Sequence, residues 1–353
     1  KTQNIYSQKR GNMSDKRYEK VELGKFEEQI QAHDAKLADV YQPMDMVEYM
    51  AGGILNLNAA GMQVEMQLNE VGWQKLCEKL GAPAGWLESP RCPIDLRVGI
   101  LNRLVKDYPE EYLYRLRREG DTQVCRSVLS KDYLRYNHLN LWNDMRWVFD
   151  NVGIDSLKPM VWKPMVDDSL DAWILFEHVV ADPNKPTTSY DGGGYGGLKP
   201  AIHFRNSEDG TGSVRIQTGL YRSYCTNGVI FGFKKEDSVR AIHMGNAYAM
   251  RAKVWQGVTS ALQFVEKGMD LYIRATEVVI EKELEEIVQS WTNKYSLSTA
   301  TSKLWSEAVK QAQPKTVADF AMATSDFAGY LSNRSITTQM EEMAGAMLMV
   351  GNL

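Results

Sequence analysis

The alternation of apolar and polar residues predicts a strand and a helix early in the chain. From Met62 to Leu68 every second residue is apolar, which is typical of a strand with one buried face. Asn69 follows directly and can cap a helix that carries Leu76 and Leu80. This region therefore predicts a strand that leads into a capped helix.

The next stretch predicts a helix, a hairpin and a second helix. Leucine and isoleucine recur at helical spacing over 96–104. The segments 112–118 and 123–129 flank the turn-prone residues 119–121, so they are expected to pair as an antiparallel hairpin. Asn137 can then cap a further helix.

The middle of the chain predicts more strands, joined by glycine-rich connections. Segments 173–180, 202–205 and 213–218 have strand character, and the last two flank the turn-rich residues 206–212. Residues 190–197 hold so many glycines that we expect a mobile loop there.

Helical spacing dominates from residue 246 onward. Apolar residues recur at three- and four-residue steps over 254–272, a heptad-like stripe continues over 273–291, and 316–353 is rich in small residues and Met. We therefore expect an α+β fold, with an antiparallel sheet core, packed helices and a long helical C-terminal region. The expected parts are a basic flexible arm (1–25), the core (26–253) and a helical packing or oligomerisation region (254–353).

Composition excludes several classes of protein and leaves local charge as the useful signal. The 353 residues hold 41 basic and 45 acidic side chains, so a uniformly basic nucleic-acid binder is excluded. Four scattered cysteines support neither a disulfide framework nor a zinc site, and no signal peptide or membrane-spanning run is found, so we expect a cytoplasmic protein with no membrane partner. Residues 91–146 and 199–253 are nevertheless locally basic, at +3 and +5.

Arginines and tyrosines are interleaved in these two basic stretches. Basic side chains neutralise phosphates and aromatic rings stack on unpaired bases, which is the combination that single-stranded nucleic acid requires. A solvated strand face is the simpler alternative for the arginines of the hairpin. The candidate binding residues are Arg115, Arg117, Arg126, Lys131, Arg135, Arg205, Asn206, Ser207, Arg215, Tyr221, Arg222, Tyr224 and Asn227, with Tyr133 as a further support for bases.

Several short motifs, taken in order, resemble one known family. They are Leu68–Glu70, Leu76–Pro83, Leu101–Arg103, Tyr114–Arg115, Arg126–Tyr133, Asn206–Ser207, Arg222 with Cys225–Gly228, and Arg240–His243. Together they are similar to the phage- and plasmid-associated domain-of-unknown-function family 932. The resemblance implies an origin in a mobile element of bacteria but leaves the activity open. The architecture is also loosely similar to that of ring-forming single-strand annealing proteins of phage recombination, which is an argument from analogy.

The leading hypothesis is a non-enzymatic homo-oligomer that binds single-stranded DNA and promotes annealing, with RNA as an open alternative ligand. It needs no cofactor, metal or catalytic residue. A nucleic-acid-processing enzyme built on His203, Cys225, Asn227 and His243 is the first alternative. A structural or host-interaction assembly protein is the second. The acidic pair Asp167–Asp168 could hold Mg²⁺, but its loop surroundings favour a solvated position.

Overall fold

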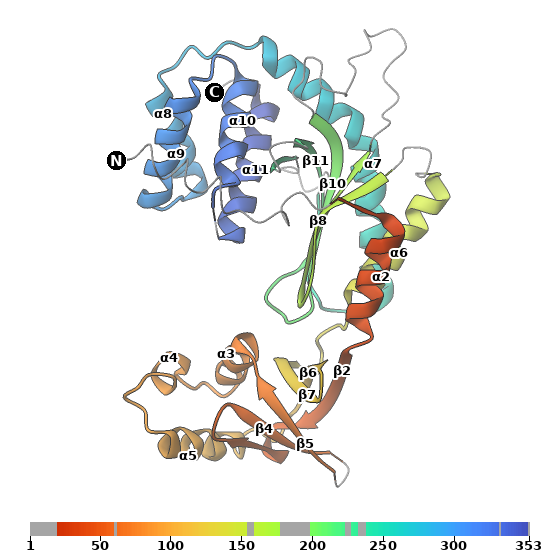
Figure 1. The fold of residues 1–353 in the computed structure, drawn as a ribbon, viewed down its shortest axis with the longest axis vertical. Coiled ribbons are helices and arrows are strands. Elements are labelled where there is room, and N and C mark those ends of the chain that lie inside the picture. The colour runs from red at the N-terminus through yellow and green to blue at the C-terminus, as the bar shows by residue number, and fades with distance from the viewer. Residues whose placement is uncertain are drawn as a thin grey trace.

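Two lobes, each built around its own β-sheet, make up the part of the chain that the structure describes (Figure 1). This computed structural model describes residues 20–59, 62–153, 159–176, 198–222, 227–231, 238–331 and 333–351. The small lobe consists of residues 37–130, and the large lobe contains the elements before and after it. The predicted α+β class and helical C-terminal region are confirmed.

The small lobe has a six-stranded sheet in the order β2-β6-β7-β5-β4-β3. Its only parallel pair among the described strands joins β5 to β7. Helices α3 and α5 cover a core that includes Trp73, Leu101 and Tyr114. The elements are β2 (Leu37–Pro43), β3 (Val47–Met50), β4 (Ile54–Ala59), β5 (Met62–Leu68), α3 (Glu70–Lys79), α4 (Ala84–Leu87), α5 (Ile94–Val105), β6 (Glu111–Glu119) and β7 (Thr122–Ser130), with a 3₁₀ turn at Met44–Met46.

The large lobe has a seven-stranded antiparallel sheet in the order β1-β8-β9-β10-β11-β12, and β13 also pairs with β11. One face of this sheet packs on α2, α6 and α7 around Phe26, Trp142 and Phe204. Its elements are β1 (Lys20–Glu22), α2 (Leu23–Asp34), α6 (His138–Val152), β8 (Pro159–Val166), β9 (Ser169–Phe176), β10 (Leu198–Ser207), β11 (Val214–Arg222), β12 (Asn227–Phe231), β13 (Ser238–Ala241) and α7 (Ala247–Glu277).

Four C-terminal helices form a second core of the large lobe, beside β12 and the far end of α7. Trp305, Phe320 and Met347 are buried in this core. The helices are α8 (Leu284–Tyr295), α9 (Thr299–Ala312), α10 (Val317–Ala328) and α11 (Arg334–Val350). Among the described elements, α10 and α11 contact β12, which lies at one edge of this sheet.

Most elements lie where the apolar pattern predicts them. Asn69, Asn137 and Asn246 are the N-caps of α3, α6 and α7, and the predicted hairpin is β6–β7. Residues 20–25, assigned to the arm by charge, form β1 and the start of α2. The glycine-rich loop 190–197 lies outside the described residues. No helix in the described part of the chain is both long enough and apolar enough to cross a membrane.

Candidate functional site

Four charged residues lie in register across neighbouring strands of the large sheet. Asp171 of β9 is opposite Arg205 of β10, Arg205 is opposite Arg215 of β11, and Arg215 is opposite Arg240 of β13. Leu170, Phe204, Val214 and Ala241, each beside one of them along its strand, belong to the core under α7. Because successive side chains on a strand point to opposite faces, this arginine row lies on the other face of the sheet.

Like charges directly opposite one another destabilise a sheet, so the row requires anions nearby. Arg205 Nε lies 3.0 Å from Asp171 Oδ2, and Arg215 Nη1 lies 3.6 Å from Glu342 Oε1 of α11. Burial and the charges of Arg205 and Arg240 lower the pKa of Arg215, while Glu342 opposes this shift. Arg240 is exposed and forms no ion pair with the described residues.

The arginine row lines a cleft of about 810 Å³. One wall is the turn formed by residues 207–213, and the opposite wall is the first half of α11. Arg205 Nη1 donates to Thr338 Oγ1 across the cleft at 3.3 Å. The other polar side chains that line this arginine cleft include Asn206, Ser207, Thr211, Ser213, Ser335 and Gln339. The lining is therefore rich in hydrogen-bond donors and carries three arginines.

Internal hydrogen bonds hold the 207–213 turn. Ser207 Oγ donates to Asp209 Oδ1 at 2.6 Å. Asp209 Oδ1 also accepts from the backbone N–H of Thr211 at 2.9 Å. Gly210 has a φ of 77°, a left-handed conformation that favours glycine. The turn also carries Glu208, which points away from the cleft lining toward the small lobe.

Two buried arginines of the β6–β7 hairpin tie the small lobe to this turn. Arg115 donates from Nη1 to the carbonyl oxygen of Glu208 at 3.0 Å and from Nε to Asp39 Oδ1 at 3.1 Å. Arg126 Nη1 lies 2.7 Å from Glu208 Oε2 and 3.1 Å from Asp168 Oδ1. Both arginine side chains are 0% exposed, so the junction is a buried charge network.

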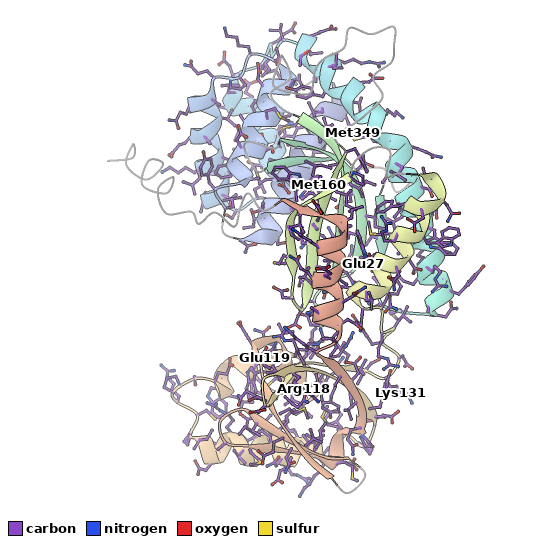
Figure 2. All side chains as sticks on the ribbon, turned by 45° about the vertical axis from the view of Figure 1, so that its right-hand side comes forward. Glu27, Arg118, Glu119, Lys131, Met160 and Met349 are labelled. Carbon is purple, nitrogen blue, oxygen red and sulfur yellow. The ribbon has the colours of Figure 1, made fainter. Side chains whose placement is uncertain are left out.

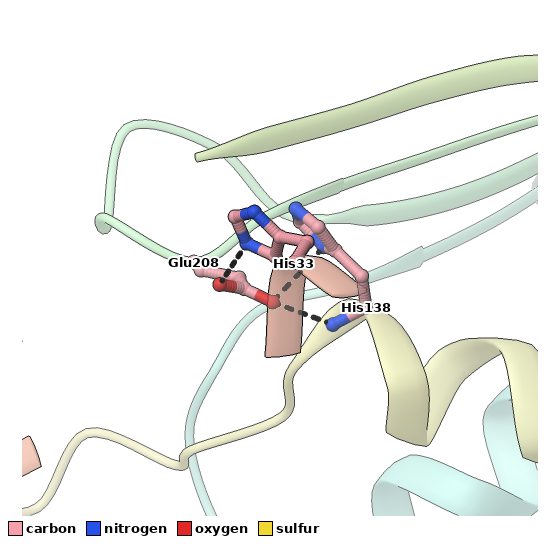
Figure 3. A group of neighbouring side chains, drawn as sticks. All are labelled: His33, His138 and Glu208. Atoms are coloured by element: carbon pink, nitrogen blue, oxygen red, sulfur yellow. Dashed lines mark hydrogen bonds and ion pairs between the residues drawn. The ribbon is translucent and has the colours of Figure 1, made fainter. Parts of the chain in front are cut away.

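Glu208 is the centre of the junction network (Figure 3). Its Oε1 accepts from the backbone N–H of His138 at 2.7 Å, at the first turn of α6, and His33 Nε2 lies 3.2 Å from Oε2. Since α2 carries His33 and β7 carries Arg126, one carboxylate joins three separate parts of the chain.

Burial and charge shift the pKa values within the network. Burial alone would raise the pKa of Glu208, but the His33 hydrogen bond and the charges of His138 and Arg126 lower it overall. Burial lowers the pKa of His138 to about 4 and that of His243 to about 4. At neutral pH the network therefore pairs the Glu208 carboxylate with Arg126, beside neutral His138 and His243.

His33, His138 and Glu208 are close enough together to hold a metal ion. However, Glu208 Oε2 is already engaged by Arg126. His138 Nε2 lies 2.9 Å from the carbonyl oxygen of Asp167, and its Nδ1 lies 3.1 Å from Asn206 Nδ2. Because the potential ligand atoms have protein partners and a guanidinium supplies the positive charge, the cluster fits a structural network better than a metal centre.

Comparison with known proteins gives one match. The sequence model of DUF932, a domain of unknown function, matches residues 177–344. This segment belongs to the DUF932 family. No curated protein and no solved structure matches the chain.

The DUF932 match confirms the predicted family. It covers residues 177–344, whereas the motifs that carried the resemblance begin at Leu68. It spans β10, β11, β13 and most of α11, so it contains the three arginines of the row and Glu342. The small lobe lies outside the match, although several of the motifs that carried the resemblance lie there. The arginine cleft is therefore a feature of the DUF932 segment, with Asp171 added from the preceding strand.

Two of the predicted binding arginines are buried away from any ligand. Arg115 and Arg126 lie neither on a solvent face nor on a rim, because the large lobe covers them and carboxylates pair with them. Arg117 is 19% exposed and pairs with Glu119 and with Asp168, whose Oδ1 lies 2.7 Å from Nη1. Asp168, expected to be solvated, instead joins the junction network.

The other predicted residues of the first basic stretch are more accessible. Lys131 and Arg135 are exposed near the junction, and Figure 2 labels Lys131 beside the small lobe. The Arg135 guanidinium lies over the Tyr41 ring, 5.4 Å from its centroid. Tyr133 donates from its hydroxyl to the carbonyl oxygen of Ser207 and stacks on His243, so it supports the turn in this structure.

The predicted residues of the second stretch separate into three groups. Arg205, Asn206, Ser207 and Arg215 meet at the arginine cleft. Tyr221 and Arg222 lie in β11, where Arg222 is opposite Asn227 of β12, and their side chains are outside the described parts. Tyr224 lies outside the described residues.

The alternative catalytic group is divided in the described part of the structure. His203 Nε2 lies 2.9 Å from Asp171 Oδ1, and its ring stacks on Trp173. His243 instead contacts Asn206 Oδ1 and the carbonyl oxygen of Leu134. The two histidines thus have different partners, and Cys225 lies outside the described residues.

Three residues of the cleft and the junction network are not predicted from the sequence. Arg240 has no local signal beyond the 240–243 motif, and its register with Arg215 is set only when β13 pairs with β11. Glu342 comes from a helix more than a hundred residues away, and no local pattern could have placed it at the cleft. Glu208 lies in a turn-rich segment that was interpreted only as a connection.

Proposed function

We propose that this chain binds single-stranded DNA and that the arginine cleft holds its phosphate backbone. The observation that carries the proposal is the register of Arg205, Arg215 and Arg240 on one sheet face beside a polar cleft. Arginine presents several N–H donors in a planar fork that matches phosphate oxygens. Annealing by a homo-oligomer is the broader form of this proposal.

The availability of the three arginines differs, which indicates where a phosphate would bind. Arg205 is fixed by Asp171 and Thr338, so it is a positioning contact at the base of the row. Arg215 is 34% exposed with a long 3.6 Å contact to Glu342. Arg240 is exposed. We therefore assign the main phosphate contacts to Arg215 and Arg240.

The hydroxyl and amide groups around the row complete a surface for phosphate oxygens. Ser213 and Ser335 line the same cleft from opposite walls. Hydroxyls and backbone amides commonly supplement arginine in contacts to the sugar–phosphate chain, and these contacts carry no sequence information. Binding with little sequence preference is therefore the expected behaviour.

A fluorescent oligonucleotide titration tests the proposal. The affinity of the wild-type chain should fall about sevenfold between roughly 50 and 200 mM salt, as expected for the two phosphate contacts of Arg215 and Arg240 on a single strand. Arg215→Gln should weaken binding at low salt. The matched control is Arg103→Gln in α5, where the side chain is 75% exposed in the small lobe. No binding at low salt, or equal loss in both variants, would overturn the proposal.

A further inference from the structure

Glu342 places a second carboxylate beside the arginine row. It extends from α11, and its Oε1 accepts from Gln217 Nε2 at 3.1 Å while lying 3.6 Å from Arg215 Nη1. The Glu342 side chain is 24% exposed, so it shares the open cleft with any ligand of Arg215.

The other carboxylate of the row is committed to its neighbours. Asp171 is 4% exposed and lies 2.9 Å from His203 Nε2 and 3.0 Å from Arg205 Nε. Its charge is therefore a fixed partner of Arg205. Glu342 is the carboxylate that a ligand in the open part of the cleft would meet.

The charges of the cleft lining sum to one positive charge. Three arginines face two carboxylates, Asp171 and Glu342. A phosphodiester within a nucleic-acid chain carries one negative charge, whereas a terminal phosphate carries about 1.5 to 2 at neutral pH. The single positive charge of the lining thus balances the charge of a phosphodiester. The additional negative charge of a terminal phosphate would lie close to the Glu342 carboxylate.

We propose that Glu342 is a specificity-determining residue that favours an internal phosphodiester over a terminal phosphate. This inference rests on the proposed binding of single-stranded DNA in the same cleft. Arg240 has no ion-pair partner among the described residues and can bind one phosphate, while Glu342 repels a ligand that carries a second charge next to Arg215. Selection against the wrong ligand by a repulsive group is a common source of specificity.

Competition between two small ligands tests this role. A labelled oligonucleotide is bound first, and either a dinucleoside monophosphate or a nucleoside 5′-monophosphate is added. Each competitor has one phosphate, but only the second has a terminal one. The wild-type chain should favour the dinucleoside, and Glu342→Gln should shift the ratio of the two inhibition constants toward the terminal phosphate by about fivefold, the effect of one unit charge near 4 Å in water.

Two variants control for overall charge and for local shape. Glu307→Gln removes one negative charge from an exposed position of α9, outside the cleft lining, and should leave the ratio unchanged. Glu342→Asp keeps the charge and should retain the wild-type preference. Inorganic phosphate is a third competitor, and it should gain in Glu342→Gln as the terminal phosphate does.

The outcomes separate this inference from the proposed function. If the wild-type chain binds the oligonucleotide but Glu342→Gln has the same ratio of inhibition constants as Glu307→Gln, the proposed role of Glu342 is wrong. The proposal that the arginine cleft binds DNA is then unaffected. If the wild-type chain does not bind the labelled oligonucleotide at all, both proposals fall. A shift in Glu342→Asp equal to that in Glu342→Gln would assign the effect to shape and would also overturn the role of charge.

Discussion

The two groups of arginines in this molecule have the same chemistry and opposite environments. Arg115 and Arg126 lie at the junction of the lobes with no exposed surface and with carboxylates or carbonyl groups at hydrogen-bond distance. Arg215 and Arg240 lie on an open sheet face beside a cleft. Arginines on strands therefore indicate a polyanion site only when the opposing surface leaves their guanidinium groups accessible.

The 207–213 turn separates these two environments and contacts both. Ser207 lines the arginine cleft, while its neighbour Glu208 enters the junction network. Substitutions on the two sides of this turn should therefore have different consequences. Changes at the junction should reduce stability, and changes in the cleft should reduce ligand binding.

The largest expected effect comes from breaking the central buried pair. Arg126→Met should lower the free energy of unfolding by about 3–5 kcal/mol, because Glu208 would keep a buried charge without its guanidinium partner. Arg240→Gln should change the same quantity by less than about 0.5 kcal/mol, since that side chain is exposed. Denaturant unfolding followed by circular dichroism measures both. Similar losses in the two variants would contradict the division between the two groups.

Acid should weaken the junction. Burial lowers the pKa values of His138 and His243 to about 4, below the unfolded value near 6.5, so the unfolded chain takes up protons that the folded chain does not. Stability should therefore fall from about pH 6.5 toward pH 4, by up to about 1.4 kcal/mol per pH unit for each histidine.

Glu208 should add to this loss at lower pH. Its pKa is lowered in the folded state, so its contribution is present above about pH 4.5 and is lost as the pH falls further. Urea midpoints between pH 7.5 and about 4 measure the histidine effect, midpoints at still lower pH add that of Glu208, and Arg240→Gln should show the same profile as the wild type. A midpoint that stays constant over this range would show that the junction does not hold neutral histidines.

An intermediate effect is expected from the shared turn. Gly210→Ala should lower the free energy of unfolding by about 1–3 kcal/mol, because φ is positive there and a Cβ would lie 2.6 Å from Leu129 Cδ2. Gly99→Ala in α5 meets no neighbouring atom and should stabilise the protein by up to about 1 kcal/mol. Thermal melts of both variants check this. Equal melting temperatures would contradict this prediction and would show that the turn accommodates the added Cβ without loss of stability.

Local pattern was sufficient for the elements and insufficient for the site. Alternation predicts the strand at 62–68, Asn caps predict the helix starts at 69 and 137, and apolar spacing predicts the helix from 246, because these signals depend on neighbours in the chain. The burial of Arg126 depends on Glu208, which lies 82 residues away. Likewise Arg215 meets Glu342 only through the packing of α11 on the sheet. Such contacts leave no periodic signal in the sequence.

The salt dependence of oligonucleotide binding reports how many phosphates the arginine cleft contacts. On a single strand, each phosphate contact contributes about 0.7 to the slope of log affinity against log salt. The double variant Arg215→Gln/Arg240→Gln should therefore have a slope about 1.4 lower in magnitude than the wild type, and Arg103→Gln should keep the wild-type slope. Equal slopes for the wild type and the double variant would contradict the assignment of the arginine cleft as the phosphate-binding surface.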